Sequence, residues 1–293
     1  MIKVRVLILG KNGFLGSYFR TLSKAAGATL TSNVESADQK IVTHSDFENF
    51  FSKLSSIDVV INCLARANID FCENNPEEAQ WVNATLPGLI SEYCAEKSIS
   101  MVHFSTDAVF DGSSSLVSEN METNPLSVYG KTKLDGERNV ILNYDKAIVI
   151  RTNFFGCSPR RDSFAEKAME AAYANQQFSG YTDVFFTPTH ARNVVEGTFQ
   201  LINKNTSGLF HLTGEERLSK YEFARRLVAF TGNPPKLLSE KSTDNPLYAY
   251  RSKDLSLDNT KIQKFYTLKN TLDEDLRYMT EEFKLRGIYE ARG

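Results

Sequence analysis

Met1-Ile-Lys-Val-Arg-Val-Leu-Ile-Leu-Gly10-Lys-Asn-Gly13-Phe-Leu-Gly16 is the stretch that decides the fold. Residues 3 to 9 form an apolar-rich run of strand length, which is typical of a strand buried on both faces of a sheet. Three glycines follow, and Phe14 to Ala26 then reads as a helix. This order predicts a pyrophosphate cradle, because glycines allow close backbone approach and the unpaired amides of a helix N-terminus face the anion.

The glycines are spaced Gly-x-x-Gly-x-x-Gly, not the tighter Gly-x-Gly-x-x-Gly of the common dinucleotide fingerprint. A triplet alone fits a simple tight turn equally well, so its position directly after the first strand carries the prediction. A second strand is expected at Ala28 to Ser32, where NAD enzymes have an acidic residue and NADP enzymes a basic one. The candidates here, Thr31, Ser32 and Asn33, are neutral. Both NADPH and NADH therefore stay open, with a slight preference for NADPH because no carboxylate repels its extra phosphate.

Strand and helix patterns alternate along the first half of the chain. Further buried strands are predicted at Asp58–Asn62, Met101–Ser105 and Ala147–Thr152, with one or two helices from Pro76 to Lys97. This alternation predicts an α/β fold, a doubly wound parallel (Rossmann) sheet.

The pattern loosens after Arg151. The predicted helices there are separated by the proline-containing segments 233–235 and 244–246, and they lie near residues 164–174, 191–202, 220–230 and 271–285. We expect a nucleotide-binding Rossmann domain at residues 1–155, which also receives elements near 185–205. Residues 156–293 should then form most of a smaller, mixed α/β C-terminal lobe that binds the substrate.

Tyr129-Gly-Lys-Thr-Lys133 follows Ser105-Thr106-Asp107 after about two dozen residues. Asn124-Pro125 reads as an N-cap followed by a proline in the first helical position, which predicts a helix that runs to about Asn143. Tyr129 and Lys133 then share one face of that helix. A free phenol titrates near pH ~10, and an ammonium about 4 Å away lowers its pKa by roughly 3 units at an effective dielectric of about 20. In a partly desolvated cleft this pair is suited to proton exchange near neutral pH.

The spacing alone proves little, because Tyr93 and Lys97 form a second Tyr-x-x-x-Lys pair. Tyr93 lies on a predicted helix that leads into the strand Met101–Ser105, so we expect it outside the sheet as a surface or packing residue. Tyr129 instead follows a strand that ends in Ser105-Thr106-Asp107, and open parallel sheets bind ligands at the carboxyl ends of their strands. Tyr129 is therefore the predicted functional tyrosine.

Composition argues against several classes of function. The net charge is −2 with a pI near 6.2, and no basic run is present, so nucleic-acid binding is not expected. The N-terminus lacks a signal peptide's cleavage pattern and no apolar run approaches the length of a membrane span, which predicts a cytoplasmic protein without a membrane partner. The four cysteines form no Cys-x-x-Cys pair and the four histidines are scattered, so we expect reduced thiols and no metal.

Several motifs together resemble the extended short-chain dehydrogenase/reductases, and among them most closely the dTDP-4-dehydrorhamnose reductase group. In the first half of the chain they are the Gly10 loop, Val59-Val-Ile-Asn62, Ile69-Asp-Phe-Cys-Glu73, Ser105-Thr-Asp-Ala-Val-Phe-Asp-Gly112, Tyr129-Gly-Lys-Thr-Lys-Leu-Asp-Gly-Glu137 and Arg151-Thr152. The likeness continues through Thr187-Pro-Thr189, Gly208-Leu-Phe-His-Leu-Thr213, Tyr221-Glu-Phe-Ala224 and Ser256-Leu-Asp258. It therefore covers nearly the whole chain, and the combination is specific although each piece alone is common.

The resemblance implies an oxidoreductase of deoxysugar biosynthesis that reduces the 4-keto group of a nucleotide-activated deoxysugar with NAD(P)H. In that group a hydride passes from the nicotinamide to carbon 4, and a tyrosine protonates the nascent alkoxide. Tyr129 matches that acid, and Lys133 matches the lysine that lowers the phenol's pKa and binds the nicotinamide ribose. Thr106 matches the hydroxyl that hydrogen-bonds the reacting oxygen.

The predicted site combines the glycine cradle with these matches. The catalytic residues are Thr106, Tyr129 and Lys133. The cofactor-binding residues are Gly10, Asn12, Gly13, Phe14, Leu15, Gly16, Asp46, Phe47, Leu64, Ala65, Arg66, Phe104, Tyr129 and Lys133. The substrate-binding residues are Thr106, Asp107, Asn153 and Phe154, and candidates for diphosphate contacts are Arg160, Arg161 and Arg251. Asp46 could lie at the edge of an adenine pocket, but a role as a helix cap is equally consistent with the sequence. Asp107 could contact the substrate, but capping of the following turn is equally consistent.

Three residues depart from the pattern of the group. Ala108 stands where many members have tyrosine, Phe154 where a tryptophan often lies against the sugar, and Arg66 where histidine or tyrosine is common near the nicotinamide. These differences concern the identity of the sugar more than the reaction. Some relatives bind magnesium through glutamates, whereas Leu15 and its neighbours offer no such ligand.

Other functions of the same fold stay open. A dehydratase would need a second acid or base after the threonine, and Thr106-Asp107-Ala108 supplies only one carboxylate. A sugar-nucleotide 4-epimerase uses the same hydroxyl, tyrosine and lysine, and stoichiometric NAD(P)H consumption separates it from a reductase. A non-catalytic regulatory subunit resembling the methionine adenosyltransferase beta subunit is a third interpretation. The sequence does not determine the oligomeric state, for which a homodimer is one expectation.

Overall fold

The computed structural model describes residues 4–23, 29–30, 41–54, 56–160, 162–232, 237–240 and 252–290. Several sequence predictions lie outside these residues. They are the ends of the strand predicted at 28–32, the cofactor-selecting residues Thr31, Ser32 and Asn33, the arginines Arg161 and Arg251, and the proline-containing segments 233–235 and 244–246.

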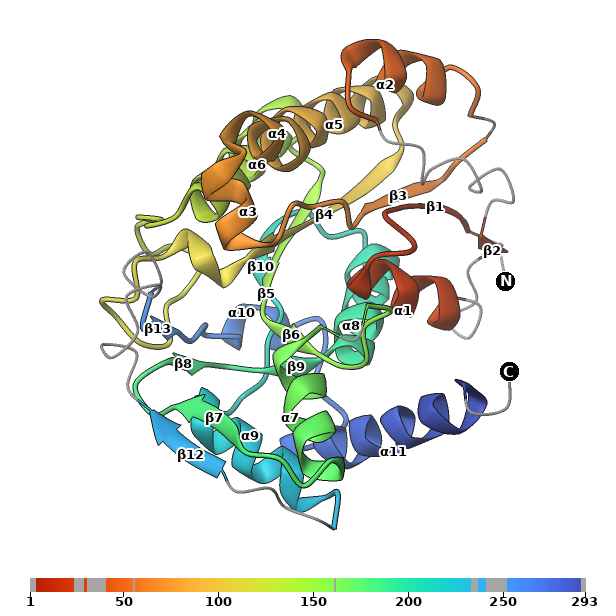
Figure 1. Ribbon diagram of the computed structural model, residues 1–293. Helices are drawn as coiled ribbons and strands as arrows, with labels where there is room; N and C mark the ends of the chain where they lie inside the picture. Colours follow the sequence, from red (N-terminus) through yellow and green to blue (C-terminus); the bar gives the residue numbers. More distant parts are fainter. Residues whose placement is uncertain are drawn as a thin grey trace.

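A six-stranded sheet forms the centre of the first lobe (Figure 1). Its strand order is β10-β5-β4-β3-β1-β2, and every pair is parallel. The strands are β1 (Arg5–Leu9), β2 (Thr29–Leu30), β3 (Val59–Asn62), β4 (Ser100–Thr106), β5 (Ile148–Thr152) and β10 (Gly208–His211). Strand order reverses beside β1, because β2 lies on one side of it and β3 on the other. This arrangement confirms the predicted doubly wound α/β fold.

Both faces of the sheet are covered, which explains the unbroken apolar run at the N-terminus. Val6 and Ile8 of β1 pack in the core beneath α1 (Phe14–Leu22) and α8 (Ala191–Asn203). Leu7 and Leu9 point the other way, into the core beneath α2 (His44–Phe51), α5 (Leu86–Lys97) and α6 (Val128–Asn143). Figure 1 shows these two helical layers on opposite sides of the strands.

Short helices connect β3 to β4. They are α3 (Ile69–Asn74), α4 (Pro76–Gln80) and a π-helical turn at Trp81–Thr85, which runs directly into α5. Pro87 lies in the first turn of α5 and has no N–H for an i−4 hydrogen bond, which accounts for the wider turn before it. Tyr93 of α5 packs its ring against Phe51 with centroids 4.8 Å apart, so its predicted packing role is confirmed.

The smaller lobe mixes short strands and helices around a core of its own. Its strands are β6 (Phe154–Phe155), β7 (Phe178–Tyr181), β8 (Phe185–Phe186), β9 (Thr189–His190), β11 (Leu218–Ser219), β12 (Leu237–Glu240) and β13 (Asp254–Leu255). Its helices are α7 (Phe164–Tyr173), α9 (Lys220–Ala229) and α11 (Leu272–Glu290), whereas α10 (Thr260–Gln263) packs beside β10 in the core of the first lobe. Strand β8 pairs antiparallel with β11 and parallel with β13. The lobe contains both helices and short strands, as the predicted mixed α/β composition requires. Within the described part of the chain, no helix is both long and apolar enough to span a bilayer.

The helix that carries Tyr129 starts later than predicted. Its N-cap is Ser127, whose hydroxyl accepts a hydrogen bond from the Gly130 N–H at 3.1 Å. The predicted cap, Asn124, instead donates its side-chain amide to the Asp111 carboxylate at 3.1 Å. A tertiary contact therefore uses the side chain that local sequence assigned to the cap, and Tyr129 lies in the first turn of α6.

Candidate active site

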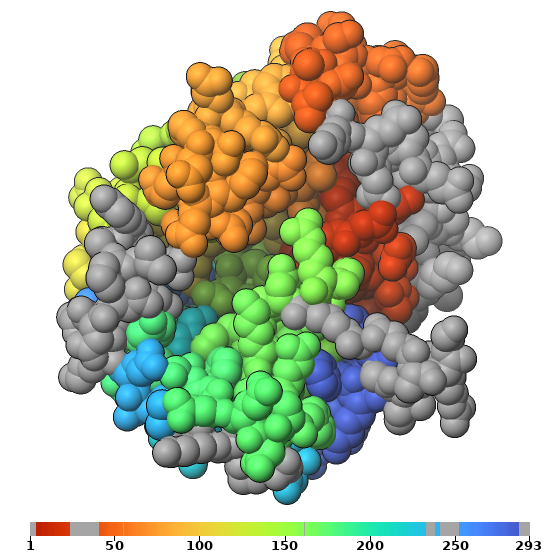
Figure 2. Space-filling view, viewed as in Figure 1, coloured from red at the N-terminus to blue at the C-terminus, as the bar shows by residue number. Residues whose placement is uncertain are grey.

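A cavity of about 990 Å³ opens at the carboxyl ends of β1, β3, β4 and β5. In Figure 2 it is the hollow between the orange surface of the segment after β3 and the green surface of the segment after β5. Open α/β sheets bind ligands at such ends, where the strand order reverses. The predicted residues that line it are Gly13, Phe14, Leu15, Leu64, Ala65, Arg66, Phe104, Tyr129, Lys133 and Phe154, together with Arg160.

The glycine loop forms one wall of this cavity. Gly10 has a φ of +78°, a conformation that favours glycine, and its carbonyl accepts the Gly13 N–H at 2.9 Å. An added Cβ at Gly16 would lie 2.1 Å from the Gly10 carbonyl oxygen, which requires a third glycine. Gly13 lines the cavity, whereas Gly10, Asn12 and Gly16 shape the turn behind it. No side chain caps α1 at Gly13, so the first N–H groups of the helix are available to an anion.

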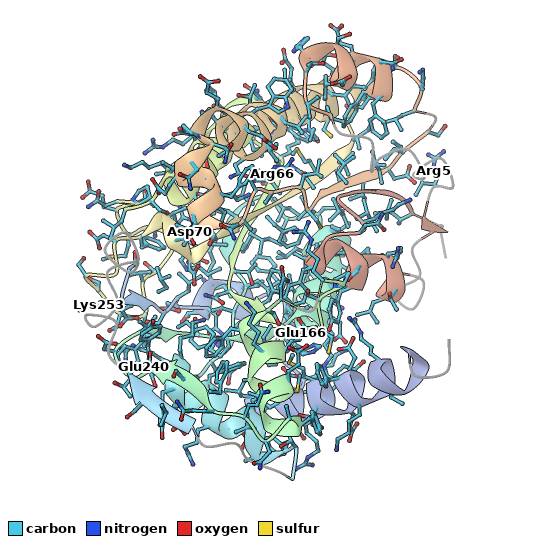
Figure 3. All side chains as sticks on the ribbon, in the orientation of Figure 1. Arg5, Arg66, Asp70, Glu166, Glu240 and Lys253 are labelled. Atoms are coloured by element: carbon cyan, nitrogen blue, oxygen red, sulfur yellow. The ribbon has the colours of Figure 1, made fainter. Side chains whose placement is uncertain are left out.

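The segment after β3 forms the opposite wall and is held by two buried asparagines. Asn62 accepts the Leu64 N–H at 3.1 Å. Asn83 accepts the Arg66 N–H at 2.8 Å and donates to the Arg66 carbonyl at 3.0 Å. The Arg66 guanidinium lies beneath α4 in Figure 3, where it pairs with the Glu78 carboxylate at 2.6 Å. The backbone of this segment is therefore held in place from both sides.

The structure brings Tyr129 and Thr106 together. A hydrogen bond with the Thr106 hydroxyl lowers the pKa of the Tyr129 phenol, but burial outweighs it and raises that pKa to about 12. The charge of Asp107 raises it further. The direction is opposite to the predicted lowering by Lys133, because the dominant effect here is the loss of solvent around the phenol.

Lys133 is 1% exposed at the inner end of the cavity. Its Nζ donates to the Phe104 carbonyl at 2.5 Å and lies 3.4 Å from His103 Nε2. Burial lowers the pKa of the ammonium to about 8, although the charge of Glu137 acts in the opposite direction. The predicted lysine is therefore in the site, and its ammonium loses its proton at a lower pH than that of an exposed lysine.

Asp107 binds both of its neighbours in the predicted substrate set. Its carboxylate accepts from the Thr106 hydroxyl at 3.0 Å and from the Asn153 amide. It does not cap the following turn: Thr106 does, by accepting the Ala108 N–H at 3.2 Å. Burial raises the pKa of Asp107, whereas the hydrogen bond from Asn153 and the positive charge of Lys220 lower it. The remaining predicted substrate residue, Phe154, packs edge-on against Phe14 with centroids 4.9 Å apart.

Asp46 and Phe47 do not line the cavity. Asp46 forms a capping box with Thr43 at the start of α2, which is the structural role that sequence left open for it. Phe47 is buried against Phe51 with centroids 4.4 Å apart. In the part of the chain that the structure describes, no group of three or more His, Cys, Asp or Glu side chains is arranged to hold a metal ion, and the four cysteines are free thiols.

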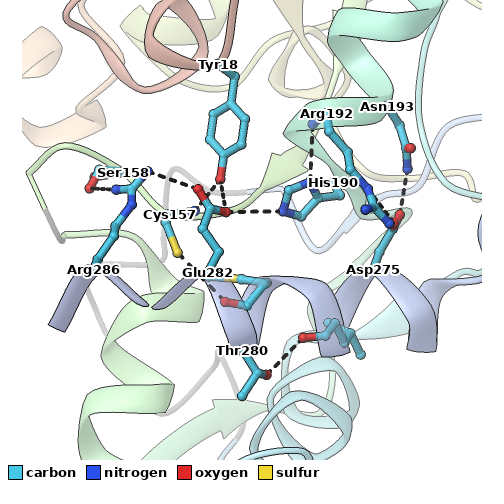
Figure 4. Close-up of polar contacts among 12 residues, drawn as sticks. Tyr18, Cys157, Ser158, His190, Arg192, Asn193, Asp275, Thr280, Glu282 and Arg286 are labelled. Carbon is cyan, nitrogen blue, oxygen red and sulfur yellow. Dashed lines mark hydrogen bonds and ion pairs between the residues drawn. The ribbon is translucent and has the colours of Figure 1, made fainter. Parts of the chain in front are cut away.

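The segment that carries Arg160 is held by the last helix, α11 (Figure 4). Arg286 donates to the Ser158 carbonyl and to Glu282, each at 3.1 Å. Tyr18 of α1 donates to Glu282 at 2.6 Å and accepts the Cys157 N–H at 2.8 Å. This cluster, Tyr18, Cys157, Ser158, Glu282 and Arg286, joins the first helix, the cavity wall and the last helix.

Sequence reasoning missed several polar residues around the site. Asn62, Asn83, His103 and Lys220 lie behind its walls, and the polar residues that line the cavity itself are Asn68, Glu78, Ser105, Thr152, Ser158, Asp162 and Ser163. Asn62 and His103 are polar residues in otherwise apolar stretches of their strands, and this pattern could have identified them. Lys220 had no such signal, because it comes from the smaller lobe. Burial lowers the pKa of its ammonium to about 8 in spite of the opposite charge of Asp107, and its Nζ lies 3.3 Å from the Phe186 ring centroid.

Comparisons with known proteins agree with this geometry. Residues 4–285 match the model of the family described as RmlD substrate binding domain. The probable low-salt glycan biosynthesis reductase Agl14 of Haloferax volcanii is 28% identical over 94% of this chain and 97% of its own length. The methionine adenosyltransferase 2 subunit beta of Mus musculus is 30% identical over 88% of this chain and 81% of its own.

Among solved structures, a dTDP-4-dehydrorhamnose reductase from Clostridium acetobutylicum superposes with a TM-score of 0.87 at 27% identity. The match covers 96% of this chain and 100% of that one. These likenesses confirm the resemblance predicted from the motifs.

Proposed function

The chain belongs to the RmlD substrate binding domain family, and from that premise we propose that it reduces the 4-keto group of a nucleotide-activated deoxysugar with NAD(P)H. The observation that carries the proposal is that Tyr129, Lys133 and the glycine loop line one cavity, with Thr106 beside Tyr129 at the carboxyl end of β4. The reductase names of the relatives from Haloferax volcanii and Clostridium acetobutylicum support the same reaction class.

The residues present fit a nicotinamide dinucleotide. The uncapped N-terminus of α1 and Gly13 would hold the pyrophosphate, and Leu64 to Arg66 with Lys133 would hold the nicotinamide end. When bound, that cofactor supplies the hydride.

Tyr129 then gives its phenolic proton to the substrate oxygen. A phenol with a pKa of about 12 is still a stronger acid than an alcohol, so this transfer is favourable. Thr106 orients the reacting oxygen, and Asp107 with Asn153 fixes the Thr106 hydroxyl.

We also propose NADPH as the preferred cofactor, because the three residues at the selecting position are neutral. Residues 1–155 with elements near 185–205 would bind it, and residues 156–293 would form most of the substrate-binding lobe. Two observations support this division: α8 packs against α1, and Lys220 of the smaller lobe lies near Asp107. The sheet also contains β10 (Gly208–His211), which pairs with β5 and lies just after the segment near 185–205 in the sequence.

A panel of 4-keto-sugar nucleotides with NADPH or NADH tests the proposal. Wild-type protein should consume NADPH in equal amount to product, and Tyr129→Phe should lower turnover at least about 100-fold, as expected for lost general acid catalysis. Tyr93→Phe is the matched control and should leave turnover unaltered. Near-normal activity of Tyr129→Phe would remove Tyr129 from the mechanism.

The second candidate function is that of a regulatory subunit, favoured by the likeness to the mouse methionine adenosyltransferase subunit. Failure to oxidise NAD(P)H with every keto-sugar in the panel, together with tight binding of a protein partner, would support it. Turnover of a sugar nucleotide without net consumption of NAD(P)H would instead indicate a 4-epimerase.

A further inference from the structure

Three buried polar side chains lie in a row from the middle of the sheet to α6. Asn62 ends β3, His103 lies on the neighbouring strand β4, and Lys133 lies on α6. Asn62 and His103 are 0% exposed and Lys133 is 1% exposed, so no bulk water separates them. The proposed reaction uses Lys133 but assigns no role to the other two.

The direction of the hydrogen bonds in this row is set at its outer end. The Leu64 backbone N–H can only donate, and it points to Asn62 Oδ1 at 3.1 Å. The amide nitrogen of Asn62 therefore faces His103 Nδ1, at 3.2 Å. Because an amide NH₂ group can only donate, Nδ1 must accept.

The same constraint determines which tautomer His103 adopts. A neutral imidazole whose Nδ1 accepts carries its proton on Nε2. Nε2 faces Lys133 Nζ at 3.4 Å. An ammonium has three donors and no lone pair, so it would oppose this N–H, whereas an uncharged amine accepts from it.

We propose that His103, with its proton held on Nε2 by Asn62, is a positioning residue that stabilises the uncharged amine form of Lys133. The pH at which Lys133 changes charge is thereby brought toward neutrality. This inference deepens the proposed function, because it concerns a residue of the proposed site, but the hydrogen-bond directions that carry it do not depend on the reaction.

The other groups facing Lys133 do not produce this effect. Glu137, one turn further along α6, and Cys63, after β3, both raise the pKa of Lys133. Burial lowers it to about 8. Burial together with the charge of Lys133 keeps the pKa of His103 well below its usual range, so the imidazole stays neutral while Lys133 titrates. Lys133 therefore supplies positive charge to the site below about pH 8 and loses it above.

Nuclear magnetic resonance of the free protein tests the inference without substrate or cofactor. Histidine labelled with ¹⁵N should show His103 protonated on Nε2, with its signals assigned by their loss in His103→Gln. Labelled lysine should show Lys133 titrating near pH 8, assigned by loss in Lys133→Met. In His103→Gln the side-chain carbonyl can accept from the ammonium, so this midpoint should rise by about one to two pH units. His211→Gln replaces another buried histidine beside a cation, Arg151, and should leave the midpoint unchanged.

A second variant reverses the row without removing the imidazole. In Asn62→Asp the carboxylate can accept from both Leu64 N–H and His103 Nδ1–H, which moves the acceptor to Nε2. The pH midpoint of Lys133 should therefore rise in Asn62→Asp. If the tautomer causes this rise, the double variant Asn62→Asp/His103→Gln should have nearly the same midpoint as Asn62→Asp. If the new negative charge alone causes it, the rises of the two single variants should add in the double variant.

A His103 protonated on Nδ1 in the wild type, or an unchanged Lys133 midpoint in folded His103→Gln, would overturn the inference. If His103→Gln does not fold, the wild-type tautomer and Asn62→Asp still decide it. If these results hold but no keto-sugar is reduced, the proposed function fails and this inference stands.

Discussion

Replacing Glu137 with glutamine should destabilise the protein by about 3 kcal/mol. Arg151 Nε and Nη2 donate to the two carboxylate oxygens of Glu137 at 2.9 and 2.7 Å, and the side chains of Arg151 and Glu137 are 4% and 3% exposed. Removing one partner of a buried ion pair leaves an uncompensated charge, which costs about 3 to 5 kcal/mol. We take the lower end because the glutamine carbonyl still accepts one of the two bonds.

Urea unfolding with an unchanged m-value measures this loss, and the melting temperature should fall by about 6 to 12 °C. The control is Glu222→Gln in the Glu222–Arg225 pair, whose side chains are 36% and 57% exposed. It should change stability by less than about 1 kcal/mol. A loss in Glu137→Gln as small as in this control would show that burial of the pair contributes nothing.

The same substitution has a second expected effect. Glu137 lies one turn after Lys133 on α6, and its charge raises the pKa of that ammonium. Glu137→Gln should therefore lower the pKa of Lys133 further, which lysine titration by magnetic resonance would detect.

Three further substitutions test the cradle, the lysine and the choice of tyrosine. Gly13→Val should abolish cofactor binding because the side chain occupies the pyrophosphate's space, and unchanged affinity in a fluorescence titration would refute the cradle. The pKa of Lys133 is lowered from 10.5 to about 8, so the unfolded chain binds more protons between these values. The free energy of unfolding of the wild type, relative to Lys133→Met, should therefore rise by about 3 kcal/mol as the pH rises from 8 to 10.5, and a flat difference in denaturant titrations would contradict the lowered pKa. Tyr93→Phe should leave kcat unaltered, and a large loss would mean that the wrong tyrosine was chosen.

Local sequence predicted the elements whose signals are themselves local. The glycine loop, the strand before it and the helix after it are contiguous, so their order alone indicated the cradle. The spacing of Tyr129 and Lys133 likewise placed both on α6. The position of Thr106 at the end of β4 brought its hydroxyl to the same site.

Other features depend on residues distant in sequence and could not be predicted from one stretch. Ser127 caps α6, and the side chain of Asn124 instead donates to Asp111, which lies 13 residues away in the sequence. The direction of the Tyr129 pKa shift depends on how much solvent the folded chain removes from the phenol. Lys220 approaches Asp107 only because the smaller lobe packs over the carboxyl ends of the strands.

The cluster that joins Tyr18 to Glu282 and Arg286 has a consequence for biosynthesis. A ribosome releases the first helix long before the residues of α11, and domains commonly fold in the order in which they emerge. Strands β1 to β5 and the helices between them can therefore assemble early. Ser158 and Tyr18 gain their hydrogen bonds to Arg286 and Glu282 only after α11 has been made. A nascent chain stalled before Leu272 should consequently have the glycine loop in place but lack the contacts of α11 with Ser158 and Tyr18. Synthesis of α11 then completes this wall of the cavity.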